Sequence, residues 1–151
     1  MAIHDTAMVE ESTIDDADIR EYVTLLDATI GDDVTVYERT SVKHATIEGP
    51  TDVNANCFIE NATLAESVQV GPNASIVGVT HPLSETGMTY RNDVYEEVVL
   101  ETGAFVGSGA VVLPGVTVGE NAVVGAGTTV TEDVPSGCVV RGDGDTVVQE
   151  L

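Results

Sequence analysis

The sequence predicts an all-β fold, a solenoid in which short parallel strands coil into a triangular prism. Aliphatic residues recur at every sixth position in the C-terminal half, and a small or β-branched residue follows each of them by four places. A period of six matches neither the 3.6 of an α-helix nor the two of an isolated strand. Self-similarity at a fixed short period is typical of a solenoid, whose coils bury their apolar side chains by stacking on each other. The aliphatic positions are Leu100, Val106, Val112, Val118, Val124 and Val130.

Upstream of residue 80 the repeat continues with coils of seventeen residues. The aliphatic positions are six apart within each group and five apart between groups. They are Ile19, Leu25, Ile30, Val36, Val42, Ile47, Val53, Ile59, Leu64, Val70 and Ile76. We therefore predict about six coils, at about 13–29, 30–46, 47–63, 64–80, 100–117 and 118–135.

The repeat is interrupted once. The hexads stop after Thr80 and resume at Leu100, so residues 81–99 must leave the prism as an extruded loop. A long loop in a compact domain is commonly functional, and Tyr90 and Tyr95 favour an ordered flap. We expect one domain over residues 1–151, with an N-terminal cap at 1–12, coils at 13–80 and 100–135, and a C-terminal tail at 136–151.

The composition predicts a cytoplasmic protein that needs no disulfide. Each fully buried Val, Leu or Ile contributes roughly 1.5–3 kcal/mol, so the inward aliphatic residues suffice to hold the stack. Cys57 occupies an inward small position and Cys138 lies in the tail, a spacing that indicates neither a bridge nor a metal site. The N-terminal residues show no signal-peptide pattern, and no apolar run is long enough to span a membrane.

The charge is strongly negative. The chain has 26 acidic residues against five basic ones, a formal net charge of −21, and Lys43 is its single lysine. The acidic residues are spread over every coil, which favours adaptation to molar salt, and hence a high-salt organism, over a disordered acidic tract. No basic surface is available for phosphates, so we expect neither a nucleic acid nor a membrane as partner.

Two segments resemble the hexapeptide-repeat acyltransferases. They are Thr80-His81-Pro82 with the loop that follows, and the run from Phe105 to Pro135, which is similar to the maltose and galactoside O-acetyltransferase branch. The resemblance covers residues from about 70 to 140 and implies a left-handed parallel β-helix, an exception to the right-handed crossover rule. It also implies a homotrimer with active sites between subunits, and acetyl transfer from acetyl-CoA to a hydroxyl of a sugar or sugar-like acceptor.

The resemblance implies two catalytic groups. Transfer to a hydroxyl needs a base that takes the proton as the oxygen attacks the thioester, and an imidazole suits this role near neutral pH. His81 stands where the family places its catalytic histidine, whereas His4 and His44 lack this context and are expected to be solvated. The backbone N–H of Ser108, 27 residues later, would stabilise the oxyanion, although an ordinary corner residue would look the same.

The binding residues are less closely specified. By resemblance, the pantetheine arm of CoA would run along Gly107, Ala126, Gly127 and Thr131, with Arg141 the nearest cation for its phosphates. Sugar hydroxyls have five candidates, each equally a turn or surface residue: Asn54, Asn56, Asn61, Tyr90 and Arg91. Phe105 would either wall the acyl channel or pack in an interface.

Departures from the family pattern leave alternatives open. Glu132 replaces a lysine, and Gly142–Gln149 replaces a segment with basic residues, so either molar salt has made those contacts dispensable or the chain is a trimeric scaffold that no longer binds CoA. An N-acetyltransferase acting on an amino sugar is the enzymatic alternative. A γ-type carbonic anhydrase needs three histidines around a metal, and only His81 is suitably placed, so we expect no metal.

The charge generates the first prediction. Because salt screens repulsion among the 26 acidic residues, the melting temperature should rise from dilute buffer to molar KCl. Thermal unfolding followed by circular dichroism measures this, and an unchanged melting temperature would contradict adaptation to salt.

Overall fold

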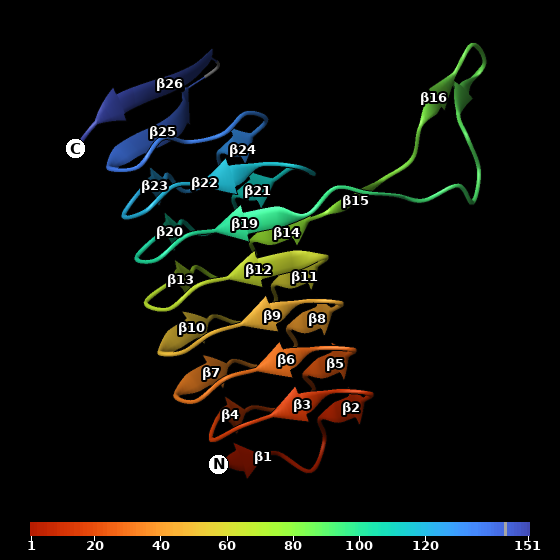
Figure 1. The fold of residues 1–151 in the computed structure, drawn as a ribbon, viewed down its shortest axis with the longest axis vertical. Coiled ribbons are helices and arrows are strands. Elements are labelled where there is room, and N and C mark those ends of the chain that lie inside the picture. The colour runs from red at the N-terminus through yellow and green to blue at the C-terminus, as the bar shows by residue number, and fades with distance from the viewer. Residues whose placement is uncertain (144) are drawn as a thin grey trace.

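The chain forms a three-sided prism of parallel strands (Figure 1), in a computed structural model that describes residues 1–143 and 145–151. Three sheets, here named A, B and C, form its faces. Sheet A contains β1 (Ala2–Ile3), β4 (Asp18–Ile19), β7 (Val34–Val36), β10 (Thr51–Val53), β13 (Gln69–Val70), β20 (Phe105–Val106), β23 (Val123–Val124), β25 (Cys138–Asp143) and β26 (Asp145–Glu150). Among the described residues there is no helix with the length and apolarity needed to cross a membrane.

The other two faces follow in the same order along the prism. Sheet B contains β2 (Met8–Glu10), β5 (Thr24–Leu26), β8 (Ser41–Lys43), β11 (Phe58–Glu60), β14 (Ser75–Val77), β21 (Val111–Val112) and β24 (Thr129–Val130). Sheet C contains β3 (Thr13–Ile14), β6 (Thr29–Ile30), β9 (Thr46–Ile47), β12 (Ala62–Leu64), β19 (Val98–Leu100) and β22 (Thr117–Val118).

The hexad residues form columns along the inside of each face. On sheet A, Val36 pairs with Ile19 in the preceding coil and with Val53 in the next, and Val70 continues the column to Val106. All five are buried. The predicted all-β solenoid and its inward positions are therefore confirmed, and the period of six corresponds to one strand and one corner of the prism.

The number of coils differs from the expected six. Sheet A has eight parallel strands, from β1 to β25, so the prism has about eight turns. Residues 1–12, expected to be a cap, contribute β1 and β2, and Ile3 pairs with Ile19 as Val9 does with Leu25. This coil escaped the repeat because it is a residue shorter, with Ile19 five places after Ile14 where later coils have six. In the tail, β25 extends sheet A and β26 pairs with it as an antiparallel hairpin.

The predicted extruded loop is confirmed, and it is an ordered arm. The chain leaves the prism through β15 (Val79–Thr80) and returns through β18 (Val94–Tyr95), which pair antiparallel. A second small hairpin, β16 (Leu83–Ser84) with β17 (Gly87–Met88), forms its tip. Figure 1 shows this segment, residues 79–97 and here called the arm, projecting from the side of the prism. The coil resumes at Val98, slightly before the expected Leu100, because Val98 is already buried in β19.

Cys57 packs inside the prism at the corner between β10 and β11. Its side chain is 3% exposed, and its Sγ lies 3.1 Å from the carbonyl oxygen of Gly71. Burial raises the pKa of the Cys57 thiol above its ordinary value of 9.0, since the thiolate would lose its hydration. The thiol therefore stays protonated in the folded protein at pH values where it ionises in the unfolded chain.

The raised pKa of Cys57 predicts a pH-dependent stability. The protonated thiol's contribution is complete below pH 9.0 and is lost as the pH rises toward the folded-state pKa, because the unfolded chain then binds fewer protons. The free energy of unfolding, measured with urea, should fall between about pH 8 and about pH 10. This fall should be smaller in Cys57→Ala than in the unaltered protein. Equal losses in the two proteins would show that the thiol does not carry the effect.

Candidate functional site

Two edges of the prism carry the candidate residues. At the A–B edge the chain turns from sheet A to sheet B, at residues 54–57, 71–74, 107–110 and 125–128. At the B–C edge it turns from sheet B to sheet C, at residue 61, the arm, residues 113–116 and residues 131–133. The two edges lie at opposite ends of the sheet B strands. Side chains at the A–B edge therefore face a different side of the molecule from side chains at the B–C edge.

His81 lies at the base of the arm, directly after β15. Its side chain is 40% exposed, and its Nδ1 lies 3.3 Å from the carbonyl oxygen of Asn92 and 3.2 Å from Oδ1 of Asp93. Both oxygens belong to the two residues that directly precede β18. Within the described residues, Nε2 has no hydrogen-bond partner. One ring nitrogen is thus held by the arm and the other faces solvent.

Ser108 lies at the A–B edge between β20 and β21. Its hydroxyl donates to the carbonyl oxygen of Pro72 at 3.1 Å, and its own carbonyl accepts the N–H of Gly127 at 2.8 Å. The backbone N–H of Ser108 has no acceptor among the described residues, a feature that it shares with Ala126 in the next coil. Two exposed backbone donors therefore follow one another along this edge.

Four predicted cofactor residues lie with Ser108 on the same edge. Gly107 donates its N–H to Val124 at 2.8 Å, and a Cβ added there would lie 2.5 Å from the nitrogen of Ala126, so the coils approach too closely for any other residue. Ala126 and Gly127 are exposed, and Arg141 follows in β25, where it donates to Gln149 at 3.0 Å. Thr131 is separate, at the B–C edge beside a cavity of about 290 Å³.

His81 and Ser108 do not come together within one chain. They lie at opposite ends of the sheet B strands, with Ser108 at the corner before β21 and His81 beyond the corner that follows β14. The sequence places His81 directly after the coil predicted at 64–80 and Ser108 in the next predicted coil, 100–117, but does not reveal that they belong to different edges. A site that contains both groups needs a second copy of the chain.

The predicted acceptor residues also divide between the edges. Asn54 and Asn56 lie at the A–B edge, where the side chain of Asn54 donates to Val70 at 2.8 Å. Asn61 lies at the B–C edge below the arm and donates to the carbonyl of Gly78 at 2.8 Å. Asn54 and Asn61 thus satisfy backbone groups of the next coil, and Asn56 has a positive φ of 59°, as corners require.

The aromatic candidates are exposed. Tyr90 is 72% exposed on the arm, and the guanidinium of Arg91 stacks on its ring at 5.0 Å from the centroid. Phe105 is 40% exposed on the outer face of sheet A, where it pairs with Gln69 of β13 and Val123 of β23. Both surfaces are available to a ligand or to a neighbouring chain.

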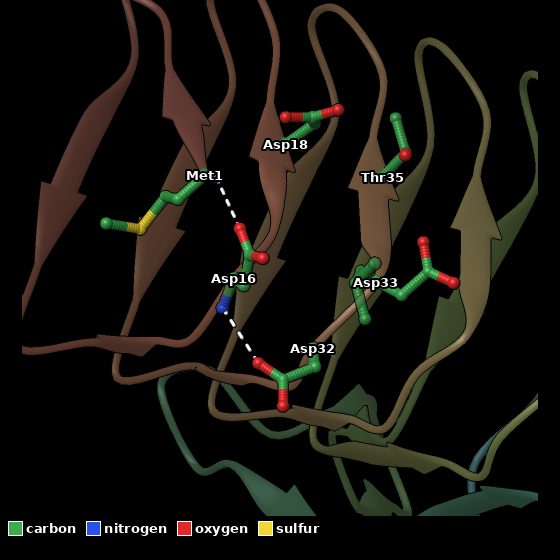
Figure 2. Close-up of a pocket in the computed structure, with 7 residues that line it drawn as sticks. Met1, Asp16, Asp18, Asp32, Asp33 and Thr35 are labelled. Atoms are coloured by element: carbon green, nitrogen blue, oxygen red, sulfur yellow. Dashed lines mark hydrogen bonds and ion pairs between the residues drawn. The ribbon is translucent and has the colours of Figure 1, made fainter.

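A hollow of about 550 Å³ on the N-terminal coils was not expected from the sequence. Figure 2 shows its acidic lining, in which the amino group of Met1 pairs with Asp16 and Asp32 accepts the N–H of Asp16 at 3.0 Å. The contact with Asp16 raises the pKa of the Met1 amino group and lowers that of the Asp16 carboxyl. In the described part of the chain, no group of three or more His, Cys, Asp or Glu side chains is placed to hold a metal ion.

Comparison with known proteins identifies the fold. Residues 97–132 match the family model described as bacterial transferase hexapeptide (six repeats). The resemblance to hexapeptide-repeat acyltransferases is thereby confirmed, and the repeat fits a left-handed parallel β-helix. No curated protein sequence matches this chain.

Several solved structures with the same fold are those of acyltransferases. An N-acyltransferase, AntD from Bacillus cereus, solved with dTDP-4-amino-4,6-dideoxyglucose and coenzyme A, has a TM-score of 0.78 at 17% identity, over 93% of this chain and 82% of that one. A maltose O-acetyltransferase from Clostridium difficile 630 has a TM-score of 0.64 at 21% identity, over 93% and 69% of the two chains. A variant of GDP-perosamine N-acetyltransferase from Caulobacter crescentus, solved with CoA and GDP-perosamine, has a TM-score of 0.54 at 22% identity, over 98% and 55%. At these identities the likeness establishes the fold.

Proposed function

We propose that the protein is an acetyl-CoA-dependent O-acetyltransferase that acts on a hydroxyl of a sugar or sugar-like acceptor. The observation that carries the proposal is His81 at the base of the arm, with Nδ1 held by Asn92 and Asp93 and Nε2 open to solvent. An imidazole with one nitrogen anchored and the other free is arranged as a general base. The fold is one that solved acyltransferases use, including the maltose O-acetyltransferase.

In the proposed reaction, Nε2 of His81 takes the proton of the acceptor hydroxyl as its oxygen attacks the thioester carbonyl. The carbonyl oxygen becomes negative in the tetrahedral intermediate, and the backbone N–H of Ser108 stabilises it. When the C–S bond breaks, the acyl group remains on the acceptor oxygen, and the proton returns from the imidazolium to the CoA thiolate. Every proton is accounted for by one histidine, and no metal is required.

The active site is proposed to lie between two copies of the chain in a trimer. His81 and Ser108 occupy different edges, so the B–C edge of one copy must face the A–B edge of the next. In that arrangement the pantetheine arm would run past Gly107, Ala126 and Gly127 of one copy and Thr131 of the other. The division of predicted residues between two edges supports this arrangement, because each edge carries only part of a complete site.

The acceptor chemistry has a second candidate. Two of the similar structures are an N-acyltransferase and an N-acetyltransferase solved with sugar nucleotides and coenzyme A bound. An N-acetyltransferase would use the same base and donor site on an amine. Parallel assays with a sugar and its amino analogue separate the two functions. A scaffold without donor binding is the non-enzymatic alternative, because Glu132 stands where the family has a lysine.

The charge supports a cytoplasm of high salt as the working environment. In molar salt the Debye length shrinks to about 3 Å, and a surface contact between a lysine and a phosphate loses most of its value. Loss of the family's basic residues is then compatible with donor binding, through Arg141 and through contacts with the uncharged part of CoA.

Donor binding and base catalysis are tested together. Calorimetry in molar KCl should show similar affinities for acetyl-CoA and its 3′-dephospho form, because few cations face the phosphates. His81→Ala should bind acetyl-CoA like the unaltered protein but lose about 10²–10⁴-fold in turnover with the accepted sugar. Failure of both nucleotides to bind would favour the scaffold, and near-normal turnover of His81→Ala would remove the base from the mechanism.

The division of the site between subunits predicts complementation. Ser108→Pro removes the backbone N–H, and His81→Ala removes the base, so each homotrimer should be inactive. Trimers refolded from a mixture of both chains should regain activity, because some of their sites combine His81 of one chain with Ser108 of the other. A mixture as inactive as its components, with mixed trimers verified by mass spectrometry, would contradict a shared site.

A further inference from the structure

The three histidines of the chain differ in what surrounds Nδ1. Nδ1 of His4 accepts the backbone N–H of Thr6 at 3.2 Å, so His4 must carry its proton on Nε2 when neutral. Nδ1 of His44 lies 2.9 Å from Oδ2 of Asp27, an acceptor, so His44 must carry its proton on Nδ1. The surroundings therefore assign opposite tautomers to two exposed histidines of the same protein.

His81 has an arrangement of the second kind, with two oxygens near Nδ1 at longer distances. Two oxygens approach its Nδ1, the Asn92 carbonyl at 3.3 Å and the Asp93 carboxylate at 3.2 Å. Neither of these oxygens is a donor when Asp93 is ionised, so Nδ1 carries the proton and Nε2 keeps its lone pair. The free nitrogen is thus the basic one, as proton abstraction from a hydroxyl requires.

The fold of the arm sets this contact. Pairing of β15 with β18 closes the base of the arm, with Thr80 opposite Val94. His81 directly follows β15, and Asp93 directly precedes β18, so the antiparallel pairing brings them face to face. Without this closure, the eleven residues 82–92 would separate His81 from Asp93 as an open loop.

We propose that Asp93 is a positioning residue for His81. Together with the Asn92 carbonyl it holds the ring in the Nδ1–H tautomer, and its carboxylate stabilises the positive charge that the ring acquires when Nε2 takes the acceptor proton. The proton later leaves from Nε2 to the CoA thiolate, so Asp93 itself gains and loses none. The catalytic consequence rests on the proposed function, whereas the hold on the ring does not.

Ring nitrogen-15 NMR tests the hold on the ring directly. The spectra are recorded above the pH range in which imidazoles ordinarily titrate, and the three histidines are assigned by single substitution to Gln. We expect the Nδ1–H tautomer for His81 and His44 and the Nε2–H tautomer for His4. In Asp93→Ala, the Nδ1–H share of His81 should fall while His4 and His44 keep their signals.

Steady-state kinetics test the consequence for turnover. Asp93→Ala should lower kcat about ten-fold. This is near the lower end of the range for loss of a charged partner, because both side chains are partly exposed. The KM for acetyl-CoA should change by less than about two-fold. Asp27→Ala is the matched control, since it removes the corresponding partner of His44 at the same edge. It should alter the His44 tautomer and leave kcat unchanged.

Three results would overturn the proposal. They are an Nε2–H tautomer for His81 in the unaltered protein, an unchanged tautomer in Asp93→Ala, or an unchanged kcat in that variant despite a changed tautomer. If the unaltered protein acetylates no acceptor, the proposed function fails by that result. The tautomer of His81 in the two proteins then still decides whether Asp93 holds the ring.

Discussion

The structure depends on one constraint, the in-register stacking of inward aliphatic side chains from coil to coil. Every strand is only two or three residues long over most of the prism, too short to be stable as an isolated pair. A strand persists because its inward residue packs on those of the coils above and below. The columns therefore fix the register, and the register fixes which residues fall at the corners.

Close stacking also limits what a corner can contain. At Gly71 and Gly107, both at the A–B edge, an added Cβ would lie 2.7 and 2.5 Å from a backbone nitrogen of the next coil, closer than atoms can approach. The A–B edge above residue 70 is consequently a narrow strip of backbone with small side chains. Such a strip leaves N–H groups such as that of Ser108 open to a ligand. This exposure follows from the close stacking of the coils, whether or not the N–H groups serve in catalysis.

The arm shows how a long insertion is accommodated without breaking the columns. β19 pairs with β12 across the whole insertion, Val98 with Ala62 and Leu100 with Leu64, and both of its inward residues are fully buried. The insertion leaves and returns at one corner, so the core closes beneath it. His81 therefore stands where the regular solenoid ends and a less constrained segment begins, and only there can a partner such as Asp93 be brought to it from outside the repeat.

The extent to which the sequence predicts this protein follows from the same division. The hexads predict sheets, inward residues and the extruded arm, because burial imposes a period that the sequence must keep. The first coil deviates from that period, since Ile3 and Val9 lie at the open end and are only partly covered. Two features of the site leave no periodic signal in the sequence. The separation of His81 from Ser108 depends on which corner each residue reaches, and the contact of His81 with Asp93 depends on how the arm folds back.

The basic residues complete the argument about the donor. Four of the five stack on aromatic rings, Arg20 on Tyr37, Arg39 on Tyr22, Lys43 on Phe58 and Arg91 on Tyr90. The first three pairs lie on the N-terminal coils and the fourth on the arm. Arg141 is thus the one cation of the described residues on the coils where CoA would bind, and it already donates to Gln149. If the proposed function holds, donor affinity would come mainly from the uncharged contacts along the A–B edge, which salt does not screen.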